Sequence, residues 1–375
     1  MTETLRFFPA ISDIPAARWD ALAGPQPCLR HAYLAALEDT GCVGPTTGWR
    51  PQHATLWDDD TLVAAMPLYE KQHSWGEYVF DWAWAEAYAR HGLDYYPKWL
   101  SAIPFTPIPG RRLLGIDRSA RARLLQQVLA WVEAGGHGSI HWLFPTEDDA
   151  ALMRDCGLLL RHGVQFHWHN AGYADFEAFL AALTRDKRKK IRQERRRVVD
   201  AGITFEWRDG HALGAGDLAF FHHCYRLTYA QRRSTPYLSH DFFAALVHAQ
   251  PASVRLLTAS RDGTPVACAW FLVDESTLYG RYWGAVEAVS CLHFETCYYQ
   301  AIDYAIRHGL TRFEGGAQGE HKLSRGLRSV PTCSAHWIRD PRFRDAIDDH
   351  LARERHGVAL YLDELDERTP FRPAP

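Results

Sequence analysis

The chain has 375 residues, of which 47% are hydrophobic and 23% charged, and its net charge is -3 at pH 7. This length and composition predict a folded protein of about two domains and exclude an intrinsically disordered chain. The near-neutral charge also excludes a protein that binds polyanions over its whole surface, although a local basic patch remains compatible with it.

Targeting signals and thiol usage narrow the class of protein further. No run of 18 apolar residues is present, so we expect no membrane span. The N-terminus MTETLRFFPA lacks a basic stretch followed by an apolar core, so we expect no signal peptide. The 8 cysteines are scattered without a C-x-x-C pair, which favours reduced thiols and a cytoplasmic location.

The first half of the chain contains one recognisable α/β unit. Residues 54–69 read as strand, acidic turn and strand, with Thr61, Val63 and Ala64 just after the turn. A helix is predicted at about 119–134 and a short strand at 139–144, separated by a glycine pair.

A strongly basic segment lies between the two halves. The helix predicted at 185–201 carries nine basic residues in 185–197 against two acidic ones, a net of +7. Ile191 and Val198 form a thin apolar stripe on which this helix can pack. The preceding segment repeats apolar residues at helical spacing, at Phe176, Phe179, Leu180 and Leu183.

The second half repeats the order of the first. Residues 255–273 form a predicted hairpin around Asp262-Gly263, and T-x-V-A again follows the turn. The strand Val266–Val273 is apolar at every position, which predicts burial on both faces. A helix follows at about 293–307 and a short strand at 311–314, so two copies of one unit are the economical interpretation.

The glycine-rich loop after that strand carries the candidate chemistry. It reads GGAQGEHKLSRGL and contains Glu320, His321, Lys322 and Arg325. Glycines let the backbone approach a ligand closely and expose N–H groups. Glu320 and His321 are candidate proton acceptors, because a near-neutral imidazole suits general-base work. Residues 341–368 alternate in charge and predict a long surface helix.

These segments resemble the FemAB-like family, within the wider group of GNAT-type acyltransferases. The resemblance lies in the basic segment LTRDKRKKIRQERRRVVDA, in the helix ending in T-x-x-x-R at Thr228 and Arg232, in STLYGRYWGA, and in LHFETCYYQAIDYAIRHGLTRFEGGAQGEHK. More closely, the last string looks like the predicted N-acyltransferases of the peptidoglycan biosynthesis/recognition group. The resemblance to the family covers about residues 170–340 well, whereas in the first half only the order of the predicted elements matches.

The resemblance implies two tandem GNAT-like domains with mixed sheets flanked by helices. We expect residues 1–165 to form the acceptor side and residues 166–375 the donor side with the catalytic loop. The family implies transfer of an acyl or aminoacyl group to an amine or peptide acceptor, with no tightly bound cofactor. Fem proteins use aminoacyl-tRNA and ordinary GNAT enzymes use acyl-CoA. The Q/R-x-x-G-x-G/A loop of the CoA users is absent here, so both donors stay open.

Roles are implied for three groups of residues. Lys322 falls at the family's FK lysine and would stabilise the oxyanion of the tetrahedral intermediate. The expected substrate-binding residues are Arg232, Arg233, Tyr237, Tyr282, Trp283, Glu295 and Arg325. The expected donor phosphate-binding residues are Arg185, Arg188 and Arg192.

A metal site and two other functions are alternatives to transfer. His293 and Cys297 have metal-ligand spacing, but no second cluster accompanies them, so no metal is predicted. One alternative function is a non-catalytic module that binds a cell-wall peptide or amino compound. The other is an RNA-binding protein, with tRNA as a partner, that acts through 185–197.

Overall fold

The computed structural model describes residues 3–316 and 319–372 and divides into two units. The first unit consists of Met1–Gly163 and Pro331–Leu360, and the second of Val164–Val330 and Tyr361–Pro375. The first boundary lies close to the expected one. Residues 331–360 differ from the expectation, because they belong to the first unit and not to the second.

The first unit contains two sheets. The smaller has the order β1-β3-β4-β7, with β1 at Glu3–Phe8, β3 at His53–Asp58, β4 at Thr61–Met66 and β7 at Leu114–Gly115. The larger has the order β15-β8-β6-β5-β2, with β15 at Arg328–Ile338, β8 at Ser139–Leu143, β6 at Lys98–Ser101, β5 at Tyr69–Lys71 and β2 at Trp49–Pro51. The helices are α1 at Ala16–Ala23, α2 at His31–Asp39, α3 at Trp82–Arg90, α4 at Arg118–Ala134 and α5 at Glu147–Asp155.

Residues 331–360 belong to the first unit because the strand β15 pairs with β8, which is far from it in the sequence. Ser334–Ile338 of β15 pairs antiparallel with β8, and α12 (Pro341–Glu367) begins shortly after β15 ends. Phe343, Ile347 and Leu351 of α12 are buried against Trp84 and other aromatic residues of the first unit. Besides its alternating charges, α12 therefore has an apolar stripe, and this stripe packs the helix against the first unit.

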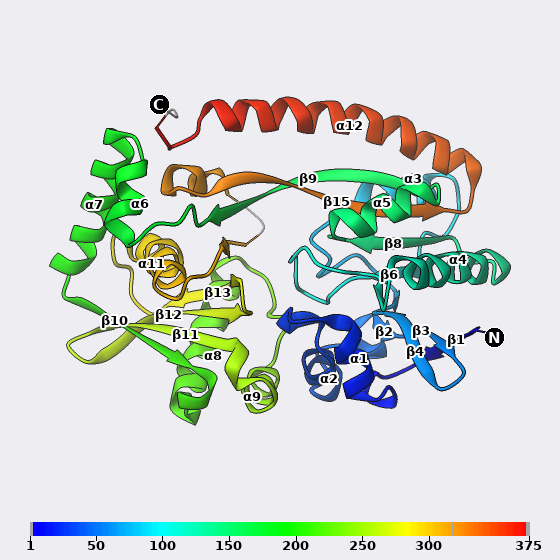
Figure 1. The fold of residues 1–375 in the computed structure, drawn as a ribbon, viewed down its shortest axis with the longest axis horizontal. Helices are drawn as coiled ribbons and strands as arrows, with labels where there is room; N and C mark the ends of the chain where they lie inside the picture. Colours follow the sequence, from blue (N-terminus) through cyan, green and yellow to red (C-terminus); the bar gives the residue numbers. More distant parts are fainter. Residues whose placement is uncertain (1–2, 317–318, 373–375) are drawn as a thin grey trace. The chain divides into compact units, whose positions relative to one another are not determined.

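The second unit contains a mixed sheet with the order β10-β11-β12-β13-β14-β9 (Figure 1). Its strands are β10 at Ile203–Asp209, β11 at Val254–Arg261, β12 at Thr264–Val273, β13 at Thr277–Ala285, β14 at Arg312–Glu314 and β9 at Leu159–His169. Its helices are α6 at Phe176–Ala182, α7 at Arg185–Asp200, α8 at Ala215–Gln231, α9 at His240–Ala249, α10 at Leu292–Phe294 and α11 at Gln300–Arg307.

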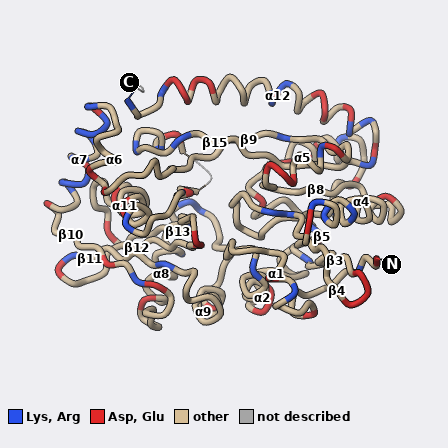
Figure 2. Tube along the Cα trace, in the orientation of Figure 1, with Lys and Arg blue, Asp and Glu red and all other residues tan. Residues whose placement is uncertain are grey.

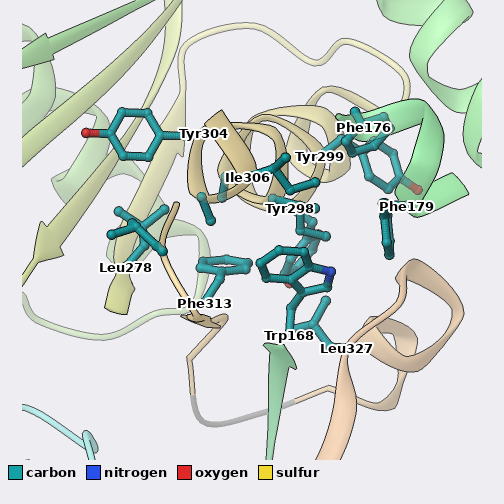
Figure 3. Packing of buried hydrophobic residues seen from close by; sticks show 14 of the residues in the cluster. Trp168, Phe176, Phe179, Leu278, Tyr298, Tyr299, Tyr304, Ile306, Phe313 and Leu327 are labelled. Atoms are coloured by element: carbon teal, nitrogen blue, oxygen red, sulfur yellow. The ribbon is translucent and has the colours of Figure 1, made fainter. Parts of the chain in front are cut away.

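Helices cover both faces of the second unit's sheet. Phe271 of β12 faces the core shared with α6 and α11, while Trp270, one residue earlier, meets Phe221 of α8 and Phe243 of α9. Figure 3 shows the α6–α11 side, where Trp168 and Phe313 from the sheet lie under the helix. β12 is buried from Val266 to Val273, as its continuous apolar sequence predicts.

The two units repeat one arrangement. Each has an antiparallel hairpin, β3–β4 or β11–β12, where the T-x-V-A segments begin the second strand. Each also has one parallel strand pair, β6–β8 or β13–β14, whose second strand follows a long helix. Parallel pairs require such a crossover, so the repeat seen in the sequence corresponds to a repeat of topology.

The helix at 293–307 differs from the prediction in one respect. After the short helix α10 at Leu292–Phe294, residues Glu295–Tyr299 form a π-helical turn, and regular α-helix resumes at Gln300. The wider turn brings the consecutive residues Tyr298 and Tyr299 both into the core, at 4% and 0% exposure. π-helical turns of this kind occur frequently at functional sites.

Candidate functional site

The candidate site begins where the parallel pairing of β13 and β14 ends. The two strands pair over Thr277–Tyr279 and Arg312–Glu314, after which β14 stops and β13 continues along β12. A bulge at Arg281 interrupts the β12–β13 ladder, and bulges redirect side chains next to active sites. Gly280 permits a close approach, since a Cβ there would lie 3.2 Å from the Glu314 carbonyl oxygen. The loop after β14 therefore leaves the sheet at an irregular and crowded point.

Lys322 is buried in the 3-10 helix Glu320–Arg325, with 2% of its surface exposed. Its Nζ donates a hydrogen bond to the Gly316 carbonyl oxygen at 2.7 Å. Burial lowers the pKa of Lys322 from 10.5 to about 8, and the nearby Cys297 opposes this shift. An ammonium has three donors, and within residues 3–316 and 319–372 the bond to Gly316 is the one hydrogen bond that the Nζ makes.

His321 and Tyr298 form a hydrogen-bonded pair beside this lysine. The His321 Nε2 lies 3.0 Å from the Tyr298 hydroxyl oxygen. Burial, followed by the charges of Arg325 and Lys322, lowers the pKa of His321 below 6.5, so its imidazole is neutral at pH 7. The ring of His293 is centred 5.5 Å from that of Tyr298, and burial lowers the pKa of His293 to about 4. Neutral imidazoles thus lie next to a buried cation.

Glu320 is engaged elsewhere. Its carboxylate accepts a hydrogen bond from the Tyr361 hydroxyl at 2.7 Å and one from Arg368 at 3.0 Å. These partners lower the pKa of Glu320, which makes its carboxylate a weaker base. This arrangement gives no support to the expected role of Glu320 in proton transfer.

Arg325 and Glu295 both form internal ion pairs. Arg325 is 3% exposed and pairs with Glu194 of α7 at 3.2 Å. Glu295 pairs with Arg195 of the same helix at 3.1 Å and accepts a hydrogen bond from Gln300 at 2.8 Å. These ion pairs join α7 to the loop and to the π-helical turn, and the expected contact of both residues with substrate stays a prediction.

The remaining expected substrate-binding residues lie around the end of β13. Trp283 packs against His293 with ring centroids 5.3 Å apart, whereas Tyr282 points to the other face and meets Tyr225 of α8 at 5.0 Å. Arg232 is exposed, and its charge contributes to the lowered pKa of His293. Two further expected residues, exposed Arg233 and half-buried Tyr237, lie in the connection between α8 and α9.

The basic helix α7 has two distinct faces. Ile191 and Val198 are buried as the apolar stripe predicts, and basic residues occupy many of the other positions of the helix (Figure 2). Of the expected phosphate contacts, Arg185 and Arg192 are exposed and Arg188 is half-buried. Arg192 forms an exposed ion pair with Glu177 at 2.5 Å.

Two groups in this region were not predicted from the sequence. Tyr298 lies in the helix predicted at 293–307 and was given no role there, but its hydroxyl is the partner of His321. Glu194 was expected only as a charge within the basic run. Its spacing from Ile191 and Val198 places all three on one helix face, and this is the signal that predicts its burial.

Metal ligands and membrane-spanning helices are both absent from the described part of the chain. Within residues 3–316 and 319–372, no group of three or more His, Cys, Asp or Glu side chains is arranged to hold a metal ion. Among the described helices, none combines the length and apolar character needed to cross a bilayer.

Comparison with solved structures shows the fold. FemX matches with a TM-score of 0.54 at 13% identity, over 92% of this chain and 99% of FemX. The C-terminal DUF2156 domain of a candidate lysylphosphatidylglycerol synthetase from Agrobacterium fabrum matches with a TM-score of 0.56 at 11% identity, over 91% and 97% of the two chains. L-PGS from Bacillus licheniformis matches with a TM-score of 0.52 at 11% identity, over 82% and 91%. The expected mixed α/β fold of the tandem GNAT type is confirmed.

Comparison at the level of sequence shows the family. A search of curated proteins finds no match. The sequence model of the FemAB-like family, described as peptidoglycan biosynthesis/recognition, matches residues 10–373. Since this match spans nearly the whole chain, the protein belongs to the FemAB-like family, a family of the N-acyltransferase type.

Proposed function

We propose that this protein transfers an aminoacyl group from aminoacyl-tRNA to the amine of a small or peptide acceptor, forming an amide bond. The observation that carries the proposal is the buried Lys322 ammonium, whose one hydrogen bond among the described residues is to the Gly316 carbonyl oxygen. A cation in a dry site is a strong stabiliser of negative charge that develops on a carbonyl oxygen.

The chemistry follows from the groups around this lysine. The acceptor nitrogen attacks the donor carbonyl carbon, a C–N bond forms, and the carbonyl electron pair moves to the oxygen. Lys322 Nζ donates to that oxyanion. The intermediate then collapses, the bond from carbon to the leaving oxygen breaks, and the leaving oxygen takes up a proton. Positioning and charge stabilisation supply most of the rate, without a covalent intermediate on the protein.

His321 supplies the proton acceptor in this proposal. When its Nε2–H donates to the Tyr298 hydroxyl, its Nδ1, which has no hydrogen-bond partner among residues 3–316 and 319–372, can accept the proton that the acceptor amine loses. The lowered pKa of His321 keeps the imidazole neutral at pH 7, which is the form that can act as a base.

The shape of α7 favours aminoacyl-tRNA over acyl-CoA as the donor. The helix has 16 residues and so spans about 24 Å, with exposed cations along its length. That length exceeds what the clustered phosphates of one CoA molecule occupy and suits the repeated phosphates of a nucleic acid backbone. Arg185, Arg188 and Arg192 are the proposed contacts.

The first unit is the proposed acceptor side. Three large apolar side chains are exposed in and after the segment between β5 and α3: Trp75 at 60%, Phe80 at 53%, and Trp82, the first residue of α3, at 38%. Exposed clusters of large apolar side chains mark interaction sites more often than chance. Because aminoacyl-tRNA is a cytoplasmic donor, we also propose that the protein acts in the cytoplasm.

A donor-consumption assay tests the function. Purified protein is incubated separately with a panel of aminoacyl-tRNAs and a panel of acyl-CoAs, each with a mixture of amines and cell-wall peptides, and mass spectrometry identifies the products. We expect an aminoacylated acceptor, with formation about 100-fold slower in Lys322→Met. Consumption of acyl-CoA alone would overturn the donor assignment. Binding of an acceptor with no turnover from either panel would support the non-catalytic module instead.

A further inference from the structure

Arg325 connects the helix α7 to the turn that carries Lys322. Its NH1 donates a hydrogen bond to the His321 carbonyl oxygen at 2.6 Å. Its NH2 lies 3.2 and 3.3 Å from the two carboxylate oxygens of Glu194. The guanidinium also stacks on Phe294, with its central carbon 3.4 Å from the ring centroid. Arg325 is therefore fixed on three sides, and one of its contacts closes the turn around Lys322.

Glu194 is an unusual member of α7. It lies within a run of nine basic residues, yet only 7% of its surface is exposed. Besides Arg325, it accepts a short hydrogen bond from the hydroxyl of Tyr299 in the π-helical turn. A buried carboxylate requires such partners, because an unpaired charge in the interior is strongly unfavourable. Glu194, Tyr299 and Arg325 thus form one buried network with every member bonded to another.

The turn itself has few other fixed points. Lys322 N donates to the Gly319 carbonyl at 3.1 Å, and Gly326 N to the Leu323 carbonyl at 3.0 Å. Gly326 has a positive φ of 89° and touches α6 so closely that a Cβ there would lie 2.5 Å from the Phe179 ring. The contacts of Gly326 hold the far end of the turn. The His321 end is held by the Lys322–Gly319 bond, by the Tyr298 hydroxyl, and by two donors to the His321 carbonyl oxygen, Arg325 at 2.6 Å and the Ser324 hydroxyl at 2.9 Å.

We propose that Glu194 and Tyr299 are positioning residues for Lys322. They fix the guanidinium of Arg325, which in turn fixes the His321 carbonyl and the backbone from which Lys322 projects. This inference rests on the proposed function for its kinetic consequence. Its structural content, that the Glu194 carboxylate orders the turn at 320–327, holds independently of which reaction the site performs. A stabilising donor must be held within fractions of an ångström of its target, so a looser turn weakens it.

The variant Glu194→Gln tests the inference by two readouts. It keeps the volume of the side chain and removes the charge that holds Arg325. Hydrogen exchange followed by mass spectrometry should show peptides spanning 320–327 exchanging at least tenfold faster, while peptides from the buried strand Thr264–Val273 exchange as before. In the transfer assay, kcat should fall about tenfold and the KM for the donor should change less than twofold, because the exposed cations of α7 are unaltered.

A matched control separates positioning from general loss of stability. Asp149 in the first unit is a fully buried carboxylate that pairs with Arg121 at 2.7 Å. Asp149→Asn neutralises a similar buried pair and should leave both the exchange of 320–327 and kcat near the native values. Tyr299→Phe removes one of the donors to Glu194 and should accelerate exchange by a smaller factor than Glu194→Gln.

The outcomes distinguish this inference from the proposed function. Unchanged exchange at 320–327 in Glu194→Gln overturns the positioning role, as does an equal loss of kcat in Asp149→Asn. If the native protein shows no transfer with any donor, the proposed function fails. Faster exchange in Glu194→Gln would then still establish that Glu194 orders the turn.

Discussion

Replacing Lys322 with methionine should destroy activity and at the same time stabilise the fold at neutral pH. Methionine has a similar length and adapts to irregular apolar surroundings. Loss of one oxyanion donor lowers kcat by about 10²–10³. Because the ammonium is the active form and its pKa is about 8, native activity should also decline as the pH rises above 8.

The stability change follows from the same pKa. Burial lowers it from 10.5 to about 8, and this difference corresponds to roughly 3 kcal/mol of unfavourable burial at pH 7. Below pH 8 both the folded and unfolded states are protonated, and the folded state bears the full penalty. Between pH 8 and 10.5 the folded state releases its proton first, so native stability rises with pH. Above 10.5 the penalty has disappeared.

The methionine variant should therefore be more stable at pH 7 by about 2 kcal/mol, after about 1 kcal/mol is subtracted for the lost hydrogen bond to Gly316. For a unit of this size, that raises the thermal midpoint by about 5 °C. Calorimetry at pH 7 and pH 10.5 measures the effect, which should vanish or reverse at the higher pH. A variant that is less stable at pH 7 and retains native kcat would refute both the burial argument and the catalytic role.

Three further predictions test the rest of the site. His321→Ala should reduce kcat about 100-fold. It should also abolish the fall of kcat at acidic pH that protonation of His321 causes, which its lowered pKa places below pH 6.5. If the pH dependence of kcat is unchanged in this variant, His321 has no part in the mechanism. Gly284→Ala should destabilise the protein by at least about 2 kcal/mol in urea unfolding, because its Cβ would lie 2.2 Å from the Cys224 carbonyl oxygen of α8; a destabilisation below about 0.5 kcal/mol would contradict this close packing. Neutralising the outer face of α7 should weaken tRNA binding. The slope of log K against log salt concentration should become less steep by about 0.9 for each phosphate that the helix no longer neutralises. A slope equal to that of the native protein would exclude these contacts. The variant for this last test replaces Arg185, Arg188 and Arg192 with glutamine.

Local patterns predicted the elements well because burial follows periodicity. The uniformly apolar strand Val266–Val273 is buried along its whole length, and the stripe on α7 lies where the spacing of Ile191 and Val198 placed it. The repeated hairpins were likewise visible, because turn residues and alternation are local signals. These features depend on residues only a few positions apart.

The features that the sequence did not reveal depend on distant partners. Glu194 and Arg325 are 131 positions apart, and neither residue type suggests burial by itself. The burial of Lys322 was not predicted, because a glycine-rich loop that also contains Glu320, His321 and Arg325 resembles a solvated turn. The turn is anchored by Leu323 and Leu327, which belong to the core that contains Trp168 and Phe179. Figure 3 shows Leu327 beside Trp168.

The two faces of α7 give its charge run a role beyond the binding of phosphates. A run of nine cations is self-repelling, and a helix of this composition gains little stability from its own propensity. Glu194 and Arg195 attach it instead, through one ion pair to the turn of Lys322 and one to the π-helical turn. A polyanion bound on the outer face would relieve the repulsion between the cations and so stabilise α7. This helix also contacts the turn of Lys322, through the Glu194–Arg325 ion pair. In the proposed function, donor binding and the order of the turn at 320–327 are connected through this single helix, and Glu194→Gln should break that connection while leaving the proposed donor contacts intact.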